Sequence, residues 1–173
     1  MDWKRAWTQL RMFTFSSGVK RTAYLKRKGV FGSIGEKCMI QSRKIPLYPE
    51  LIFIGNNVRI ASNVSFLTHD VTHNMLNNLP ESLRGENRFA EKKGTITIGD
   101  NVFVGANSTI IYDVTIGNNV IIGAGSVVTK DIPDGSVAAG VPCRIIGTFE
   151  DFVEKRKNIS RGVGYESGSS DKG

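Results

Sequence analysis

Aliphatic residues recur at every sixth position along two stretches of the chain. From Ile98 the sequence divides without gaps into IGDNVF, VGANST, IIYDVT, IGNNVI, IGAGSV and VTKDIP, and IGNNVR and IASNVS form two earlier units from Ile54 to Ser65. The first residue of every unit is Ile or Val, and the fourth is Asn, Asp or Gly, residues that tolerate a left-handed backbone conformation. Each unit therefore predicts a short strand that ends in a tight turn.

A strand of this length cannot bury its own aliphatic side chain, so successive turns must stack on one another. A parallel β-helix does this, because each coil pairs with its neighbours at about 4.8 Å and the first-position side chains meet inside. Ordinary antiparallel strands alternate with a period of two and would not keep this phase. We therefore expect an all-β fold. Its first coil should be irregular, because the stretch from Pro46 to Ile52 slips phase by two.

The N-terminal arm, residues 1–29, has a helical pattern instead. Trp3, Trp7, Leu10 and Phe13 recur at helical spacing with Lys and Arg on the other faces, which predicts an amphipathic helix that ends near residues 16–18. A second short helix is expected at about residues 19–28. We expect the aromatic residues to pack on the body or on a neighbouring subunit, and the same pattern also permits weak contact with a membrane surface.

The C-terminal end also lacks the six-residue period. Residues 148–160 predict a short amphipathic helix, and residues 161–173 form a Gly- and Ser-rich tail that has nothing to bury and should be disordered. The expected organisation is an arm (1–29), a β-helix (30–147), a helix (148–160) and a tail (161–173).

The net charge of +7 belongs to the arm and not to the body. Residues 1–28 contain eight basic side chains and one acid, whereas the acidic and basic residues of the rest of the chain are equal in number. A balanced body argues against nucleic acid as a partner. The chain has no long apolar run, no signal-peptide pattern and only two cysteines, Cys38 and Cys143, so we expect a cytoplasmic protein without a disulfide framework.

The six-residue period is interrupted after Thr68 and resumes near Thr95. The segment between them, the excursion loop of residues 69–94, contains both histidines of the chain, His69 and His73. A long insertion in a compact repeat is more often functional than not. His69 is its first residue, so its imidazole should lie at the rigid edge of a coil.

The repeats and the run GAGSVVTKDIPDGSVAAGVPCRIIG, residues 123–147, resemble the hexapeptide-repeat acyltransferases, in particular the galactoside, maltose and xenobiotic acetyltransferases. The resemblance covers residues 30–147. It implies a left-handed parallel β-helix with three hexapeptides per coil, one protruding loop and short terminal helices. It also implies a homotrimer that binds acetyl-CoA along its outer face, between neighbouring subunits.

The resemblance also implies roles for individual residues. The segment NVSFLTHDVTHNML is similar to the stretch of galactoside acetyltransferases with the catalytic histidine, and His69 is the matching position, with His73 as the second choice. A histidine suits the role of general base because its pKa lies near neutrality. Asp70, His73 and Phe103 are the candidate acceptor contacts. The candidate contacts of acetyl-CoA are Ala106, Ala124, Thr129, Lys130, Pro142 and Arg144.

The function that we expect is acetyl-CoA-dependent O-acetyl transfer to a hydroxyl of a saccharide, such as a precursor of capsule, exopolysaccharide or O-antigen. N-acetylation of a nucleotide-linked amino sugar is the alternative, and a non-enzymatic β-helix scaffold is a more distant one. Zinc-dependent carbonic anhydrases built on the same helix need three histidines, whereas this chain has two, so no metal is expected.

Overall fold

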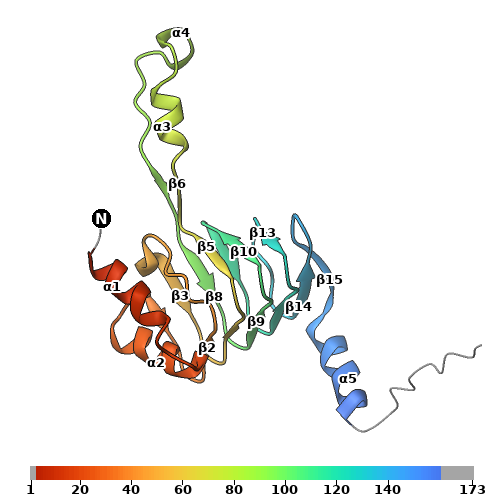
Figure 1. The fold of residues 1–173 in the computed structure, drawn as a ribbon. Helices are drawn as coiled ribbons and strands as arrows, with labels where there is room; N and C mark the ends of the chain where they lie inside the picture. Colours follow the sequence, from red (N-terminus) through yellow and green to blue (C-terminus); the bar gives the residue numbers. More distant parts are fainter. Residues whose placement is uncertain (1–2, 161–173) are drawn as a thin grey trace, which may run out of the picture.

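The computed structural model describes residues 3–160, and most of its strands lie in three parallel sheets (Figure 1). Sheet A contains β1 (Ser33–Ile34), β3 (Ile52–Ile54), β8 (Ile96–Ile98) and β11 (Val114–Ile116). Sheet B contains β2 (Met39–Ile40), β4 (Arg59–Ile60), β9 (Val102–Val104), β12 (Val120–Ile122) and β14 (Ser136–Ala139), with β15 (Arg144–Thr148) antiparallel to β14. Sheet C contains β5 (Ser65–Leu67), β10 (Thr109–Ile111) and β13 (Val127–Val128).

From β3 to β13 the strands of the coils enter sheets A, B and C in rotation, so the chain returns to each sheet once per coil. Ile98 pairs with Ile116, Val104 with Ile122 and Ile110 with Val128. The two members of each pair are separated by three complete hexapeptides. The rotation is the arrangement that a parallel β-helix with three hexapeptides per coil requires.

The core of this coil is the column of first-position aliphatic residues, as predicted. All eight are at most 2% exposed: Ile54, Ile60, Ile98, Val104, Ile110, Ile116, Ile122 and Val128. The fourth-position residues form the corners, and seven of the eight have φ between 53° and 70°. The corner asparagines also bond to one another, because Asn57 Nδ2 donates to Asn101 Oδ1 and Asn101 Nδ2 donates to Asn119 Oδ1, both at 2.9 Å.

The first and last coils depart from the spacing of three hexapeptides. Ile34 pairs with Ile54, which makes the first coil longer by the two positions of the predicted phase slip. At the other end Ile132 bridges to Ile116, so the last unit, VTKDIP, is shortened by two positions. The reason is that a full unit would place Asp134 in the core. The expected corner at Asp131 does not form, and its carboxylate accepts a hydrogen bond from the Thr115 N–H at 2.7 Å.

The N-terminal arm contains α1 (Trp3–Met12) and α2 (Gly18–Arg27). Helix α2 packs closely on β2, since a Cβ at Gly18 would come within 2.9 Å of the Met39 side chain. Helix α1 shows only that its aromatic residues do not make the first of the two contacts that we expected, packing on the body. Its Met12 is fully buried, but Trp3, Trp7, Leu10 and Phe13 are between 60% and 77% exposed, so they do not pack on the body of their own chain.

The excursion loop projects away from the coils as a narrow extension (Figure 1). Its base is a two-stranded antiparallel ribbon, β6 (His69–Asp70) and β7 (Lys92–Lys93), and its outer part contains α3 (Thr72–Asn77) and α4 (Glu81–Arg84). The irregular loop that we expected is therefore partly ordered by backbone pairing. The remaining helices are η1 (Pro49–Leu51) before β3 and α5 (Phe149–Ser160) after β15, and the predicted tail 161–173 lies outside the described residues. Between residues 3 and 160, no helix has the length and apolar character needed to cross a membrane.

Candidate active site

His69 lies where the excursion loop leaves sheet C, and the backbone on both sides of it is anchored. Thr68 is fully buried, and its hydroxyl donates a hydrogen bond to the carbonyl of Leu47. The carbonyl of Thr68 accepts a hydrogen bond from the Gly94 N–H at 3.0 Å, and His69 pairs with Lys93 in the ribbon. The imidazole is therefore attached to the rigid base of the loop and not to its tip, as predicted.

Three side chains form a cluster beside His69. The ring of Tyr48 meets the imidazole edge to face, with 5.4 Å between the ring centroids. The Tyr48 hydroxyl donates to Glu91 Oε2 at 2.9 Å, and Lys93 Nζ lies 3.1 Å from the same carboxylate and 3.9 Å above the Tyr48 ring. The hydrogen bonds of Lys93 with Tyr48 and Glu91 raise its pKa, so the ammonium stays charged.

This cluster could not be predicted from the six-residue period. Tyr48 lies in the stretch that slips phase, and its backbone is left-handed with φ 52°, a conformation that costs a bulky residue about 1–2 kcal/mol. Such strain is often found at functional sites. The phase slip could have drawn attention to Tyr48, but nothing in the sequence pairs it with Glu91.

Asp70 faces away from that cluster and holds the loop to sheet C. Its Oδ1 accepts hydrogen bonds from the hydroxyl (2.6 Å) and the N–H (3.0 Å) of Thr72, and its Oδ2 accepts one from the Tyr112 hydroxyl at 2.6 Å. These bonds, first that with the Thr72 hydroxyl and then that with Tyr112, lower the pKa of Asp70 to about 2. The carboxylate therefore stays ionised at neutral pH and serves as an anchor.

The two histidines share one unusual feature. The Nδ1 atoms of both His69 and His73 are buried, and neither has a hydrogen-bond partner within residues 3–160. A buried polar atom without a partner is uncommon and needs an explanation, such as a ligand or a neighbouring chain. His69 is the first residue of β6, whereas His73 lies on α3, in the projecting part of the loop.

Two of the candidate acetyl-CoA residues lie at the N-terminal ends of strands of sheet C. Ala106 and Ala124 stand on consecutive turns just before β10 and β13, joined by a hydrogen bond from the Gly125 N–H to the Ala106 carbonyl at 2.8 Å. A Cβ at Gly105 would lie 2.4 Å from the Ala124 nitrogen, so only glycine lets these turns stack. The result is a smooth column of small residues along the coils.

The other candidate residues for acetyl-CoA lie near the last coil and are exposed. Thr129 and Lys130 follow β13, at the C-terminal ends of the strands of sheet C. Pro142 and Arg144 lie in and after the turn between β14 and β15. Within one chain these residues do not form a closed pocket. Their arrangement, spread along an outer surface, suits an extended molecule better than a compact one.

Phe103 lies apart from His69 within one chain. Its side chain is 44% exposed on the outer face of β9, in sheet B, where its register neighbours are Arg59 and Ile121. His69, in contrast, leaves the coil from sheet C. A contact between the two side chains would require a second copy of the chain.

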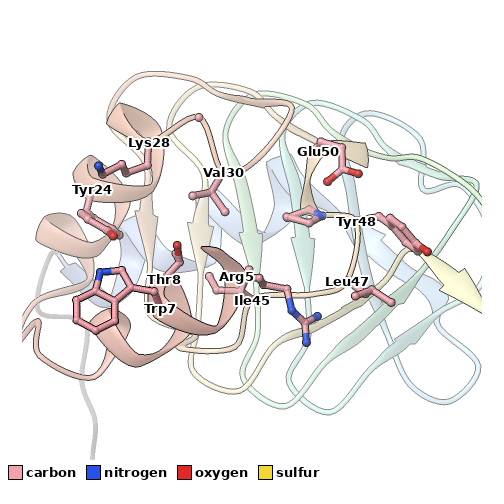
Figure 2. Close-up of a pocket in the computed structure, with 12 residues that line it drawn as sticks. Arg5, Trp7, Thr8, Tyr24, Lys28, Val30, Ile45, Leu47, Tyr48 and Glu50 are labelled. Carbon is pink, nitrogen blue, oxygen red and sulfur yellow. The ribbon is translucent and has the colours of Figure 1, made fainter. Parts of the chain in front are cut away.

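Two neighbouring cavities connect His69 with the arm. The smaller one, of about 390 Å³, is lined by His69 and Phe66, and the larger one, of about 760 Å³, lies beneath α1. They share Arg5, Ile45 and Leu47, so together they form one groove. Figure 2 shows the larger cavity with Trp7, Tyr24 and Lys28 at one end, Leu47, Tyr48 and Glu50 at the other, and Arg5 between them.

No group of three or more His, Cys, Asp or Glu side chains among the described residues could hold a metal ion. The polar side chains with titratable groups that line the two cavities are one imidazole, two phenols, one carboxylate and three cations: His69, Tyr24, Tyr48, Glu50, Arg5, Lys28 and Lys44.

Comparison with known proteins identifies the family. Residues 95–130 match the family described as bacterial transferase hexapeptide (six repeats). YvoF of Bacillus subtilis (strain 168), a protein named as an acetyltransferase, is 34% identical over 151 residues, which are 86% of this chain and 78% of YvoF. The chain belongs to the hexapeptide-repeat transferase family.

Solved structures of this family extend the likeness over most of the chain. A maltose O-acetyltransferase from Clostridium difficile 630 is 32% identical with a TM-score of 0.57, and the match covers 82% of this chain and 81% of that one. A galactoside acetyltransferase in complex with coenzyme A is 30% identical with a TM-score of 0.56, and that match covers 87% and 83%. The predicted family is confirmed, and with it the prediction that the chain is an acyltransferase.

Proposed function

We propose that this hexapeptide-repeat transferase moves the acetyl group of acetyl-CoA to a hydroxyl of a saccharide, with His69 as the general base. The observation that carries the proposal is the position of His69: it is held at the rigid base of the loop, lines the groove and has a buried ring nitrogen without a partner. Two of the relatives named above act on sugars, galactoside and maltose, which supports a saccharide acceptor.

The reaction needs one proton to move. As the acceptor oxygen attacks the thioester carbon, the imidazole of His69 takes the hydroxyl proton, and backbone N–H groups can stabilise the oxyanion. When the tetrahedral intermediate collapses, the C–S bond breaks and the thiolate of coenzyme A receives that proton. The C–O bond formed in the attack remains in the acetyl ester.

Transfer without an acyl-enzyme intermediate agrees with the state of the cysteines. Cys38 and Cys143 are both buried, and burial raises the pKa of the Cys143 thiol. A protonated, buried thiol is a poor nucleophile. The acetyl group would therefore pass directly from one bound substrate to the other.

The column of small residues at Ala106 and Ala124 supports a site for the pantetheine arm, because backbone atoms are accessible where side chains are short. Lys130 and Arg144 are exposed cations that could pair with phosphate groups, and Pro142 offers an apolar surface to the adenine ring. We place these residues opposite the His69 of a neighbouring subunit, in a homotrimer of left-handed β-helices.

We expect His69→Ala to lower the rate of acetyl transfer by about 10²–10⁴-fold, the range typical of general-base catalysis. His73→Ala is the matched control and should retain most of the activity. Release of the thiol of coenzyme A reports the rate, and the background from the protein should be low because both cysteines are buried. Full activity of His69→Ala, or a larger loss of activity in His73→Ala, would show that His69 is not the general base.

The class of acceptor is tested in the same assay. The panel contains neutral sugars, nucleotide-linked sugars and amino sugars. If the enzyme acetylates hydroxyl groups, sugars without a free amino group should still give thiol release. Activity confined to free amino sugars would replace the O-acetyltransferase proposal by the N-acetyltransferase alternative and leave the role of His69 unchanged.

A further inference from the structure

Helix α1 presents an apolar stripe to the outside of the molecule. Trp3, Trp7 and Leu10 follow one another at helical spacing, Phe13 lies just beyond the helix end, and these four side chains are between 60% and 77% exposed. Large apolar side chains that are exposed singly are normal, but a contiguous row of them marks an interaction surface. We call these four residues the α1 stripe.

The opposite side of α1 is firmly attached to the first coil. Met12 is fully buried, the side-chain amide of Gln9 donates to the Arg43 carbonyl, and the Ile45 N–H donates to Gln9 Oε1 at 2.7 Å. The helix is therefore already folded, and its orientation is set by these contacts. The stripe can meet a partner without the entropic cost of ordering a helix.

The charge of the arm indicates which partner fits. Residues 1–28 carry a net charge of +7, and Arg11, Lys20 and Arg27 are exposed. The rest of the chain has equal numbers of acidic and basic residues, so a second copy of the chain offers no excess of acid to the arm. A surface that is both apolar and anionic is complementary to the stripe and to its basic surroundings.

We propose that the α1 stripe docks the protein on the surface of a lipid bilayer that contains anionic headgroups. A basic amphipathic helix with aromatic residues on its apolar face lies in the plane of the interface, and tryptophan favours the level of the headgroups. The cations of the arm add electrostatic attraction to anionic lipid. Docking would bring the groove beneath α1 close to acceptors attached to lipid, but it does not depend on the proposed reaction.

The two tryptophans of the chain make a direct test possible without any substitution. Both Trp3 and Trp7 belong to the stripe, so tryptophan fluorescence, excited where tyrosine does not absorb, reports on this helix. With vesicles of phosphatidylglycerol and phosphatidylcholine, the emission should shift to the blue and acrylamide quenching should fall. Pure phosphatidylcholine vesicles should produce little change. Raising the salt to about 0.5 M, where the Debye length is only a few ångströms, should weaken binding roughly tenfold.

The competing occupant of the stripe is a second copy of the chain, and it has a different signature. In that case the emission would be blue and protected from acrylamide before any lipid is added, and vesicles would change neither property. This result would overturn the proposal. So would unprotected tryptophans that do not respond to anionic vesicles.

A pair of double variants distinguishes binding through the α1 stripe from non-specific adsorption to vesicles. Leu10→Ser with Phe13→Ser keeps both tryptophans and should reduce sedimentation with anionic vesicles roughly tenfold, because burial of apolar area drives insertion. Leu83→Ser with Ile159→Ser, at 74% and 56% exposed positions outside the arm, is the matched control and should bind like the natural protein. Equal binding of the two double variants, or dissociation of the oligomer caused by the first, would contradict docking through the stripe. Circular dichroism verifies that both fold, and the unsubstituted protein decides the matter if either does not.

Discussion

At the scale of single residues, Tyr48 reaches His69 because the first coil is longer than the others. The extra residues place Tyr48 in a left-handed conformation before η1, where its ring meets the imidazole and its hydroxyl reaches Glu91. The cost of that backbone conformation is offset by the contacts. Tyr48 therefore has the features of a residue that positions the base.

We expect Tyr48→Phe to lower kcat about 2- to 10-fold, the equivalent of one hydrogen bond of about 0.5–1.5 kcal/mol, because the ring contact stays while the bond to Glu91 is lost. The Michaelis constant for acetyl-CoA and the melting temperature should hardly change. Tyr24→Phe, a buried tyrosine on α2, is the matched control. If both variants had the same kcat as the natural protein, Tyr48 would have no positioning role.

At the scale of elements, the projecting loop and the coils are stabilised in different ways. Each coil repeats the same buried aliphatic residue and the same corner, so its stability is distributed over many equivalent contacts. The loop buries none of its large apolar residues and depends on its base: the β6–β7 ribbon, the Tyr48 cluster, and Asp70 with its bonds to Thr72 and Tyr112. We therefore expect the loop to open before the coils do.

The anchor at Asp70 predicts a dependence on pH. Its pKa is lowered from 3.8 to about 2 in the folded protein, so the unfolded chain takes up this proton more readily. The stabilisation is fully present above about pH 4 and is lost as the pH falls through 2.

Urea denaturation should show the natural protein more stable than Asp70→Asn at pH 6, with the difference shrinking between pH 4 and pH 2. Glu86→Gln, in the outer part of the loop, is a control of equal charge change that should show no such trend. A difference between the natural protein and Asp70→Asn that does not vary with pH would mean that the carboxylate charge is not what anchors the loop.

At the scale of the whole molecule, a single chain keeps the two halves of the proposed site apart. His69 follows β5, at the C-terminal ends of the strands of sheet C, whereas Ala106 and Ala124 precede β10 and β13, at the N-terminal ends of these strands. Phe103 lies on sheet B. A symmetric homotrimer would bring His69 of one chain against the column of small residues of the next chain. This is why the proposed site needs neighbouring subunits.

Mixing two inactive variants tests whether the site is shared. His69→Ala removes the base, and Ala124→Trp should block the column of small residues. If each site takes these elements from different subunits, about one site in four is intact in trimers reassembled from an equal mixture. Because removing the base costs about 10²–10⁴-fold, the mixture should be at least about tenfold more active than either variant alone. Two copies of the same variant mixed in the same way are the control, and a mixture no more active than its components would locate the whole site within one chain.

Much of the fold could be predicted from the sequence because the repeat is local. A short strand, a buried aliphatic residue and a left-handed asparagine recur within one hexapeptide, and their neighbours in space are the same residues of the next coil. The interruption after Thr68 was visible for the same reason, and it drew attention to His69. The resemblance to the family then indicated which residues along the coils would bind acetyl-CoA.

What only the tertiary structure decided depends on contacts between distant segments. Tyr48 and Glu91 are 43 positions apart and meet because one lies in an irregular coil and the other at the end of a loop. The last coil is short because Ile132, and not Asp134, can enter an apolar core. The outward direction of the α1 stripe was likewise not determined by its periodicity, because the pattern predicts an apolar face but not what that face meets. The attachment of Met12 and Gln9 to the first coil sets the orientation of α1 and leaves Trp3 and Trp7 more than half exposed.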